Sequence, residues 1–334
     1  MTALAVTASP LPLPRRGSHQ SRRASFVCDF SVLTTCIAKH RVRRRTALSP
    51  QFSQFYLSTR KRSPLNSTEE GRGEVDYQVL TALTSKYNDI VILDTAESRV
   101  LLLDSSGNVH SILHKAKKWT NAYWDDFATF PAIVPKGPIA ILGLGGGTAA
   151  HLMLELWPSV QLEGWEVDDI LIEKAREYLG LSDLEKHNEV GGVLKVHIGD
   201  ALSPSVAIPG GYAGIIVDLF SDAKVLPQLQ EVATWLTLKD MLMPNGRIMV
   251  NCGAATNITS RPEFAAFGPW ELNETIKALC TAFPGQINWK KLPRTAGENY
   301  LALTGPLPDL AVWSACLPEE LSSIVKQWKA CQFS

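Results

Sequence analysis

The chain has 334 residues, of which 45 % are hydrophobic and 20 % charged, and its 33 basic side chains equal its 33 acidic ones. This balance argues against a nucleic-acid binder held by excess positive charge. No apolar run reaches the ~18–20 residues that cross a bilayer, so we expect no membrane span. The six cysteines form no CxxC pair, and we expect reduced thiols and no metal site.

The basic residues gather at the N-terminus. Residues 1–65 hold 12 of the 33 Lys and Arg residues but one acid, Asp29, so residues 66–334 carry 21 basic and 32 acidic side chains. An Arg- and Ser-rich, acid-poor start is typical of an organelle transit peptide. Early prolines favour the chloroplast stroma over the mitochondrion, and we expect this segment to be disordered. A basic tail that binds an acidic partner is the alternative.

Short β-rich runs follow this segment. Asp89–Asp94 and Ser98–Asp104 predict a β-hairpin, and Asn108–Leu113 predicts a further strand. We expect residues 74–130 to form a small antiparallel unit.

From residue 131 onward, strands and helices alternate at short spacing. This alternation predicts βαβ units on a mostly parallel sheet across residues 131–310, and the final strand pair predicts an antiparallel edge. A helix is expected within residues 311–334. The predicted strands are Pro138–Leu144, Val160–Val167, Val193–Ile198, Gly214–Leu219, Gly246–Cys252, Ile287–Leu292 and Asn299–Thr304, and the predicted helices are Thr148–Trp157, Asp169–Leu179, Glu231–Leu242, Pro269–Phe283 and Pro318–Trp328.

A glycine-rich turn joins the first of these strands to the first helix. Gly143, Gly145, Gly146 and Gly147 lead directly into Thr148. Glycines at the carboxyl end of a parallel strand let a ligand approach the backbone without interference from Cβ atoms. We therefore expect a nucleoside or nucleotide to bind at this turn.

Acidic residues end the next three strands. Glu166 ends the second strand, where a carboxylate accepts hydrogen bonds from ribose hydroxyls. Asp200, followed by Ala201, ends the third, and Asp218 ends the fourth. This series favours S-adenosylmethionine over a dinucleotide, and with it a Rossmann-like fold of the class I methyltransferase type. Asp200 and Asp218 taken alone are also consistent with caps of the following helices.

At these motifs the chain resembles the spermidine synthase family of polyamine aminopropyltransferases, and more closely its divergent spermidine-synthase-like branch. The likeness covers roughly residues 85–305 and rests on SKYNDI, AYWDDFATFP, LGLGGGT, GWEVDD, GDA and IIVDLFSD. It implies a β-rich unit before a Rossmann-like domain, homodimers, and the transfer of an aminopropyl group from decarboxylated S-adenosylmethionine to an amine in polyamine biosynthesis.

The resemblance also assigns residues. Asp218 takes the place of the acid that accepts a proton from, or orients, the attacking amine, and Tyr123 matches a tyrosine of the substrate crevice. Asp222 is a further substrate-binding candidate, as is Tyr300 at a strand start near the crevice. The implied cofactor-binding set is Asn88, Gly143, Gly145, Gly146, Gly147, Thr148, Glu166, Val167, Asp200 and Ala201.

The chain departs from the family pattern where substrate is bound. Asn88 replaces a glutamine, and Trp124 replaces a histidine or glutamine. Thr148 replaces the acid that pairs with the donor's amine. Ser221 stands where a second gate acid belongs, and Asp222 comes one residue late.

A polyamine acceptor needs a second acid for its remaining ammonium group. Asp125, Asp126 and Asp222 are the candidates, although Asp125 and Asp126 are better explained as a solvated helix start.

Three alternatives to an aminopropyltransferase remain. A methyltransferase is favoured slightly by Thr148, because an acid there would repel the carboxylate of intact S-adenosylmethionine. A binding protein that has lost turnover is the second. An NAD-dependent dehydrogenase is the least favoured, since the pattern places no residues for hydride chemistry. The sequence therefore predicts a transferase with one of two related donors.

Overall fold

The computed structural model describes residues 76–254, 269–293 and 299–331. The predicted transit segment, residues 1–65, lies outside the described residues, as do Cys28 and Cys36. None of the described helices is long and apolar enough to cross a membrane.

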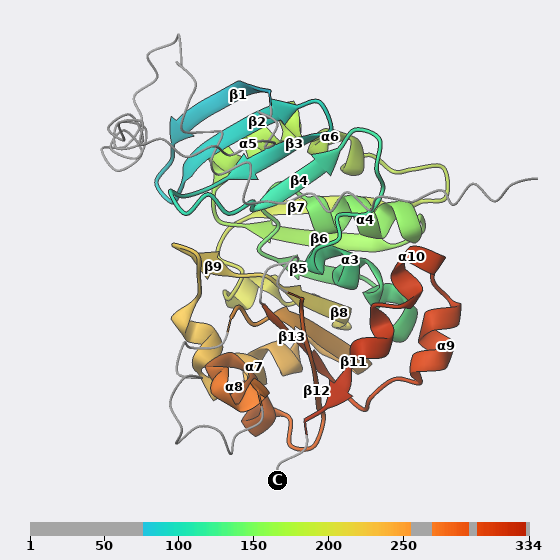
Figure 1. Cartoon of the computed structure of the whole chain (residues 1–334). Helices are drawn as coiled ribbons and strands as arrows, with labels where there is room; N and C mark the ends of the chain where they lie inside the picture. The colour runs from blue at the N-terminus through green and yellow to red at the C-terminus, as the bar shows by residue number, and fades with distance from the viewer. Residues whose placement is uncertain (1–75, 255–268, 294–298, 332–334) are drawn as a thin grey trace, which may run out of the picture.

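A four-stranded antiparallel sheet opens the described part of the chain (Figure 1, cyan). The predicted hairpin is present as β2 (Asp89–Thr95) and β3 (Ser98–Leu102). The predicted further strand is β4 (Ser111–His114), and an additional strand, β1 (Tyr77–Thr84), pairs with β2. Ile90 to Leu93 of β2 are buried, and they share a core with apolar residues of the helices that follow.

The main sheet has eight strands in the order β14-β12-β13-β11-β8-β5-β6-β7. The five from β11 to β7 are parallel, and β13 is antiparallel to both β11 and β12. This confirms the predicted α/β, Rossmann-like fold with an antiparallel edge. The strands are β5 (Ile139–Leu142), β6 (Gln161–Glu166), β7 (Val193–Ile198), β8 (Tyr212–Val217), β11 (Leu242–Asn251), β12 (Ile287–Lys291), β13 (Tyr300–Thr304) and β14 (Lys329–Ala330).

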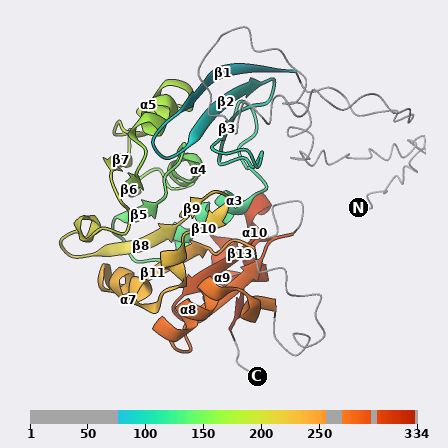
Figure 2. The ribbon, with the colours of Figure 1, turned by 90° about the vertical axis from the view of Figure 1, so that its left-hand side faces the viewer.

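Alternate residues of each strand enter two separate cores, because successive side chains point to opposite faces of a sheet. In β5, Ile139 and Ile141 pack on the side of α4 (Thr148–Leu156) and α5 (Asp169–Tyr178). Ala140 and Leu142 pack on the side of α7 (Val232–Asp240) and α8 (Glu274–Ala282). The two layers are seen on either side of the sheet in Figure 2.

Two predicted helices are corrected. The helix expected over Pro269–Phe283 is broken, because Asn273 caps α8: its Oδ1 accepts a hydrogen bond from the backbone N of Ile276 at 3.1 Å. The helix expected over Pro318–Trp328 is replaced by the short α10 (Glu319–Ser322), a 3-10 turn and β14. Trp328 is buried against Trp313 of α9 (Leu310–Ala315), so the chain turns inward instead of continuing as a helix.

Candidate functional site

The predicted site residues gather at the carboxyl edge of β5, β6, β7 and β8. Glu166 ends β6, Asp200 follows β7, and Asp218 follows β8. In an open α/β sheet, ligands bind at this edge, where the strand order reverses beside the first strand. The sheet order places β5 between β6 and β8, so the turn after β5 lies at that reversal.

The turn after β5 requires glycine. Gly143 has φ +90°, and a Cβ atom on it would lie 2.2 Å from the backbone oxygen of Asp218. Gly145 and Gly147 also have positive φ values, and Gly147 caps α4. The tight turn brings the strand ends together at the edge of the sheet.

Glu166 closes this turn from the side of β6. One carboxylate oxygen accepts a hydrogen bond from the backbone N of Gly145 at 3.0 Å, and the other accepts from Val167 at 2.9 Å and Asp168 at 3.2 Å. Burial raises the pKa of Glu166, and the three backbone donors limit the rise. The Glu166 carboxylate is thus fixed beside the glycine turn by three backbone N–H groups.

The neighbouring surface is apolar. Val167 is 38 % exposed, and Ile198, at the end of β7, is 48 % exposed. Asp200 is exposed beside them, and one of its oxygens accepts a hydrogen bond from Leu202 at 2.9 Å. Ala201 is buried. This edge therefore presents two exposed apolar side chains near the carboxylates of Glu166 and Asp200.

Asp218 lies among polar groups of other elements. It accepts hydrogen bonds from the Tyr123 hydroxyl and from Asn251 Nδ2, the latter at 2.9 Å. Burial raises the pKa of Asp218 to about 6, although both donors lower it. Tyr123 comes from α3 (Tyr123–Ala128), so the structure brings together two residues predicted for the substrate crevice. A carboxyl group with this pKa can accept a proton near neutral pH.

Two polar side chains near Asp218, Asn251 and Asn299, are not predicted from the sequence. Asn299 Nδ2 donates to Asn251 Oδ1 at 3.0 Å. Because β13 runs antiparallel to β11, the start of β13 and the end of β11 lie at the same edge as Asp218. Polar residues at these two strand ends were the available signal.

Strand β4 lies directly over the glycine turn. The Ser111 hydroxyl accepts a hydrogen bond from Gly146 N at 2.7 Å. The Thr148 hydroxyl accepts from Ile112 N at 2.8 Å and donates to Ile112 O at 3.0 Å. Thr148 therefore joins the two sheets, and its predicted contact with a cofactor stays a prediction.

We expect Thr148→Val to lower the free energy of unfolding by about 2 kcal/mol, because the buried N–H of Ile112 loses its partner. Urea unfolding followed by circular dichroism measures this change. Thr237→Val, at an exposed position on α7, is the matched control. An equal loss in both variants would show that Thr148 does not join the sheets.

Asn88 also links the two parts of the chain. Its Nδ2 donates at 2.7 Å to Asp168, the buried acid that caps α5, and the Ser85 hydroxyl donates to the same carboxylate oxygen. Asn88 thus lies beside the carboxyl edge of the sheet, because its partner Asp168 directly follows Val167. Its predicted role in cofactor binding stays a prediction.

The two remaining substrate-binding candidates, Asp222 and Tyr300, differ in their exposure to solvent. Asp222 is exposed at the turn between β9 (Phe220–Ser221) and β10 (Lys224–Val225). Tyr300 is only 3 % exposed, and its ring packs in the core beside Trp289. Substrate contact by these two residues stays a prediction, and burial weighs against it for Tyr300.

The interpretation of Asp125 and Asp126 as a solvated helix start is wrong, since both are buried. Asp125 accepts hydrogen bonds from the backbone N of Thr120 and Asn121. Asp126 forms a buried ion pair with Lys290, at 2.6 Å between Oδ1 and Nζ. Both carboxylates are satisfied by the protein itself, so neither is a ready partner for a substrate ammonium group.

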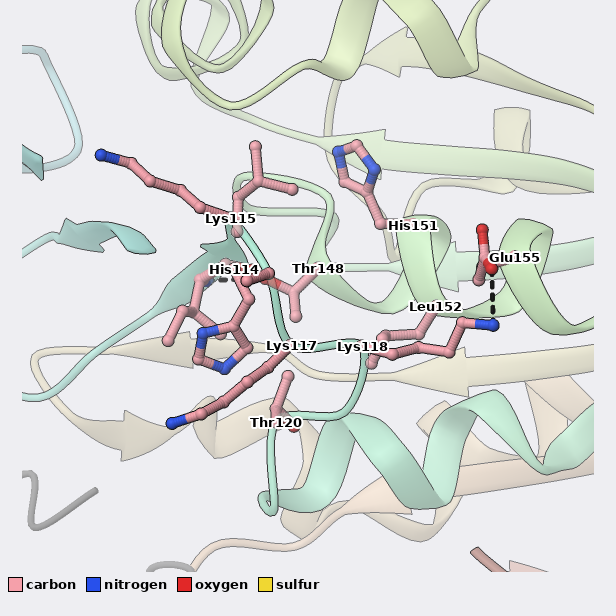
Figure 3. A pocket seen from close by; sticks show the side chains of 12 residues that line it. His114, Lys115, Lys117, Lys118, Thr120, Thr148, His151, Leu152 and Glu155 are labelled. Atoms are coloured by element: carbon pink, nitrogen blue, oxygen red, sulfur yellow. Dashed lines mark hydrogen bonds and ion pairs between the residues drawn. The ribbon is translucent and has the colours of Figure 1, made fainter. Parts of the chain in front are cut away.

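A separate hollow of about 300 Å³ opens between residues 112–120 and α4 (Figure 3). Of the predicted site residues, only Thr148 lines it. Its lysines are paired: Lys118 with Glu155 at 2.6 Å, Lys117 with Glu97 and Lys115 with Asp94. Within the described residues, no cluster of three His, Cys, Asp or Glu side chains could hold a metal.

No protein-family model matches the chain. A probable polyamine aminopropyl transferase from Bifidobacterium longum is 25 % identical over 168 residues, which are 50 % of this chain and 36 % of that protein. The human eEF1A lysine and N-terminal methyltransferase is 27 % identical over 135 residues, 36 % of this chain and 18 % of that one. The chain thus spans about a third or less of the length of these relatives.

Two solved structures share the fold. A probable spermidine synthase from Corynebacterium glutamicum has a TM-score of 0.51 and 16 % identity, covering 68 % of this chain and 79 % of that one. A spermidine synthase in complex with the transition-state analogue AdoDATO has a TM-score of 0.50 and 18 % identity, covering 68 % and 73 %. The chain is thus similar in sequence to a probable polyamine aminopropyl transferase and in fold to two spermidine synthases. In this chain, Asp218 and Glu166 keep their predicted places at the sheet edge, whereas Thr148 is bound to β4.

Proposed function

We propose that the chain is a transferase that binds an S-adenosylmethionine-type nucleoside at the carboxyl edge of its sheet. In this proposal it passes an aminopropyl group from the decarboxylated nucleoside to a small amine. The observation that carries the proposal is Asp218, a partly buried carboxyl group that accepts hydrogen bonds from Tyr123 and Asn251, has a pKa of about 6 and shares this edge with Glu166.

Glu166 would hold the ribose. One of its oxygens accepts a single backbone hydrogen bond, from Gly145, and has room for a further donor, whereas the other already accepts two, from Val167 and Asp168. Val167 and Ile198 would contact the adenine ring, with Asp200 as an acceptor for its amino group. The complex of a spermidine synthase with AdoDATO supports this class of ligand.

Asp218 would act on the amine. The donor supplies a carbon activated by its bond to a sulfonium. The neutral amine nitrogen forms a bond to that carbon, the carbon–sulfur bond breaks, and its electron pair leaves with sulfur as a thioether. The amine's extra proton passes to the Asp218 carboxylate. Tyr123 and Asn251 would orient this carboxylate toward the amine.

The charge of residues 66–334, with 21 basic and 32 acidic side chains, supports a cationic amine substrate. The second ammonium of a polyamine would need another acid, and Asp125 and Asp126 are engaged elsewhere. We therefore expect a small amine to be used more readily than a long polyamine.

Methyl transfer from intact S-adenosylmethionine is the second proposal. The similarity to a human methyltransferase favours it. Thr148 favours it as well, because no acid stands at that position to repel the donor's carboxylate.

Calorimetry with S-adenosylmethionine, its decarboxylated form and methylthioadenosine tests these proposals. Tighter binding of the decarboxylated form supports aminopropyl transfer, and tighter binding of the intact form supports methyl transfer. Binding without thioether release in the presence of putrescine would leave a binding protein. No binding of any ligand would contradict both proposals and the binding-protein alternative.

We expect Glu166→Ala to weaken nucleoside binding by about 10- to 100-fold, because a charge-assisted hydrogen bond to a ribose hydroxyl is lost. The same calorimetry measures the effect. Glu163→Gln is the matched control, since Glu163 lies on the same strand but pairs with His197 and Lys195 on the other face. Equal losses in both variants would argue against a ribose contact.

We also propose that residues 1–65 direct the chain to the chloroplast and that it forms homodimers. A fluorescent fusion of residues 1–65 tests the first proposal, and light scattering of residues 66–334 tests the second. Fluorescence in the mitochondrion or the cytosol would contradict the first, and a monomeric mass would contradict the second.

A further inference from the structure

Two asparagine side chains stand in series behind Asp218. Asn299 Nδ2 donates to Asn251 Oδ1 at 3.0 Å, and Asn251 Nδ2 donates to Asp218 Oδ1 at 2.9 Å. Asn251 is 1 % exposed at the end of β11, and Asn299 immediately precedes β13. The described contacts therefore join three separate strand ends through side chains.

The direction of this series is set by the backbone. The N–H of Gly253 points at Asn251 Oδ1 from 3.2 Å, and a backbone N–H can only donate. The atom that faces it must be the amide oxygen, so the amide nitrogen of Asn251 faces Asp218. Asn299 donates to the same oxygen and holds the amide in this orientation. A flipped amide would place its oxygen against the carboxylate and repel it.

We infer that Asn251 and Asn299 are positioning residues that orient Asp218 and keep its carboxylate ionised at neutral pH. This inference rests on the proposed function, in which the ionised form accepts the proton. The other titratable groups that face Asp218 are Tyr123, which donates to it, and His110, which lies within electrostatic range. His110 is paired with Asp104, at 3.4 Å between Nε2 and Oδ2. Asn251 therefore supplies a donor that remains neutral at every pH.

A titration of Asp218 tests the inference without requiring turnover. The carboxyl group is followed by carbon-13 NMR from pH 4 to 9, with its signal assigned by its loss in Asp218→Asn. We expect Asn251→Ala to raise the titration midpoint by about one pH unit, because a hydrogen bond that favours the charged form is lost. Asn299→Ala should raise it less, because the Asn251 amide stays but can turn. The acidic limb of any turnover should move to the same extent.

Asn288→Ala is the matched control. Asn288 is also a buried amide of the main sheet, but it donates to Leu303 O and Gly305 O. Its loss should leave the Asp218 midpoint unchanged. If Asn251→Ala fails to fold, Asn299→Ala carries the test alone. An unchanged midpoint in the folded variants would overturn the inference, whereas absent turnover in the unmodified protein would contradict only the proposed function.

Discussion

Replacing Asp218 with asparagine is expected to lower turnover by about 10²–10⁴-fold while nucleoside binding persists. The amide oxygen can still accept hydrogen bonds from Tyr123 and Asn251, so the local structure should be kept. It cannot accept the amine's proton. Thioether release in the presence of amine measures the rate, and calorimetry measures the binding.

The pH dependence provides a second signature of Asp218. Because its pKa is about 6, turnover of the unmodified protein should fall as the pH drops below 6 and the carboxylate becomes protonated. The residual activity of Asp218→Asn should lack this limb. Asp240→Asn, at an exposed position on α7, is the control that should keep both rate and limb. An acidic limb that survives in Asp218→Asn would assign the proton transfer to another group.

Stability should change in the opposite direction to activity. The pKa of Asp218 rises from its usual value of 3.8 to about 6 in the folded state, so the folded protein binds this proton more tightly than the unfolded chain does. Stability contributed by this group is therefore present below pH 4 and lost as the pH rises to about 6. Asparagine does not titrate, so the Asp218→Asn variant keeps this stability at neutral pH. Its unfolding temperature should therefore exceed that of the unmodified protein at pH 7, but not at pH 4.

The second large effect concerns the buried pair of Lys290 and Asp126. We expect Lys290→Met to lower the free energy of unfolding by about 3–5 kcal/mol, since it leaves an unpaired carboxylate in the core. Both side chains are buried, and Lys290 Nζ also donates to the backbone O of Ile324. The pair joins β12 to α3, which carries Tyr123, so the loss should also disturb the site. Urea unfolding at pH 7 measures the effect.

Acidic conditions should partly restore this variant. Burial raises the pKa of Asp126 to about 6 even with Lys290 beside it, and without Lys290 the pKa should rise further. Protonation at pH 5 would then remove the buried charge, so stability should increase as the pH falls from 7 to 5. Lys277→Met, whose exposed pair with Glu274 is worth little, is the control. A loss below 1 kcal/mol in Lys290→Met would show that the pair is dispensable.

The arrangement of the sheet edge could be predicted from the sequence because it depends on local patterns. Strand periodicity and glycine spacing located the turn at Gly143–Gly147, and right-handed βαβ connections bring the ends of successive parallel strands to one edge. Glu166 and Asp218 were found on this basis alone. Helix ends were less predictable: the cap of α8 is a local bond between Asn273 and Ile276 inside the expected helix, and the inward turn at Trp328 depends on packing against Trp313.

Only the tertiary structure decided which polar side chains meet. Asn251 and Asn299 are 48 residues apart, and Asp126 and Lys290 are 164 apart. Residues so far apart in the sequence leave no periodic pattern, because strand pairing and burial, and not local geometry, bring them together. Asp125 and Asp126 at the start of α3 are an example. Their sequence is typical of an exposed helix start, but both are buried, because backbone N–H groups and the buried Lys290 stabilise their charges. The sequence by itself therefore determined the fold class and the acidic edge, whereas the protonation state and partners of each acid were decided by packing.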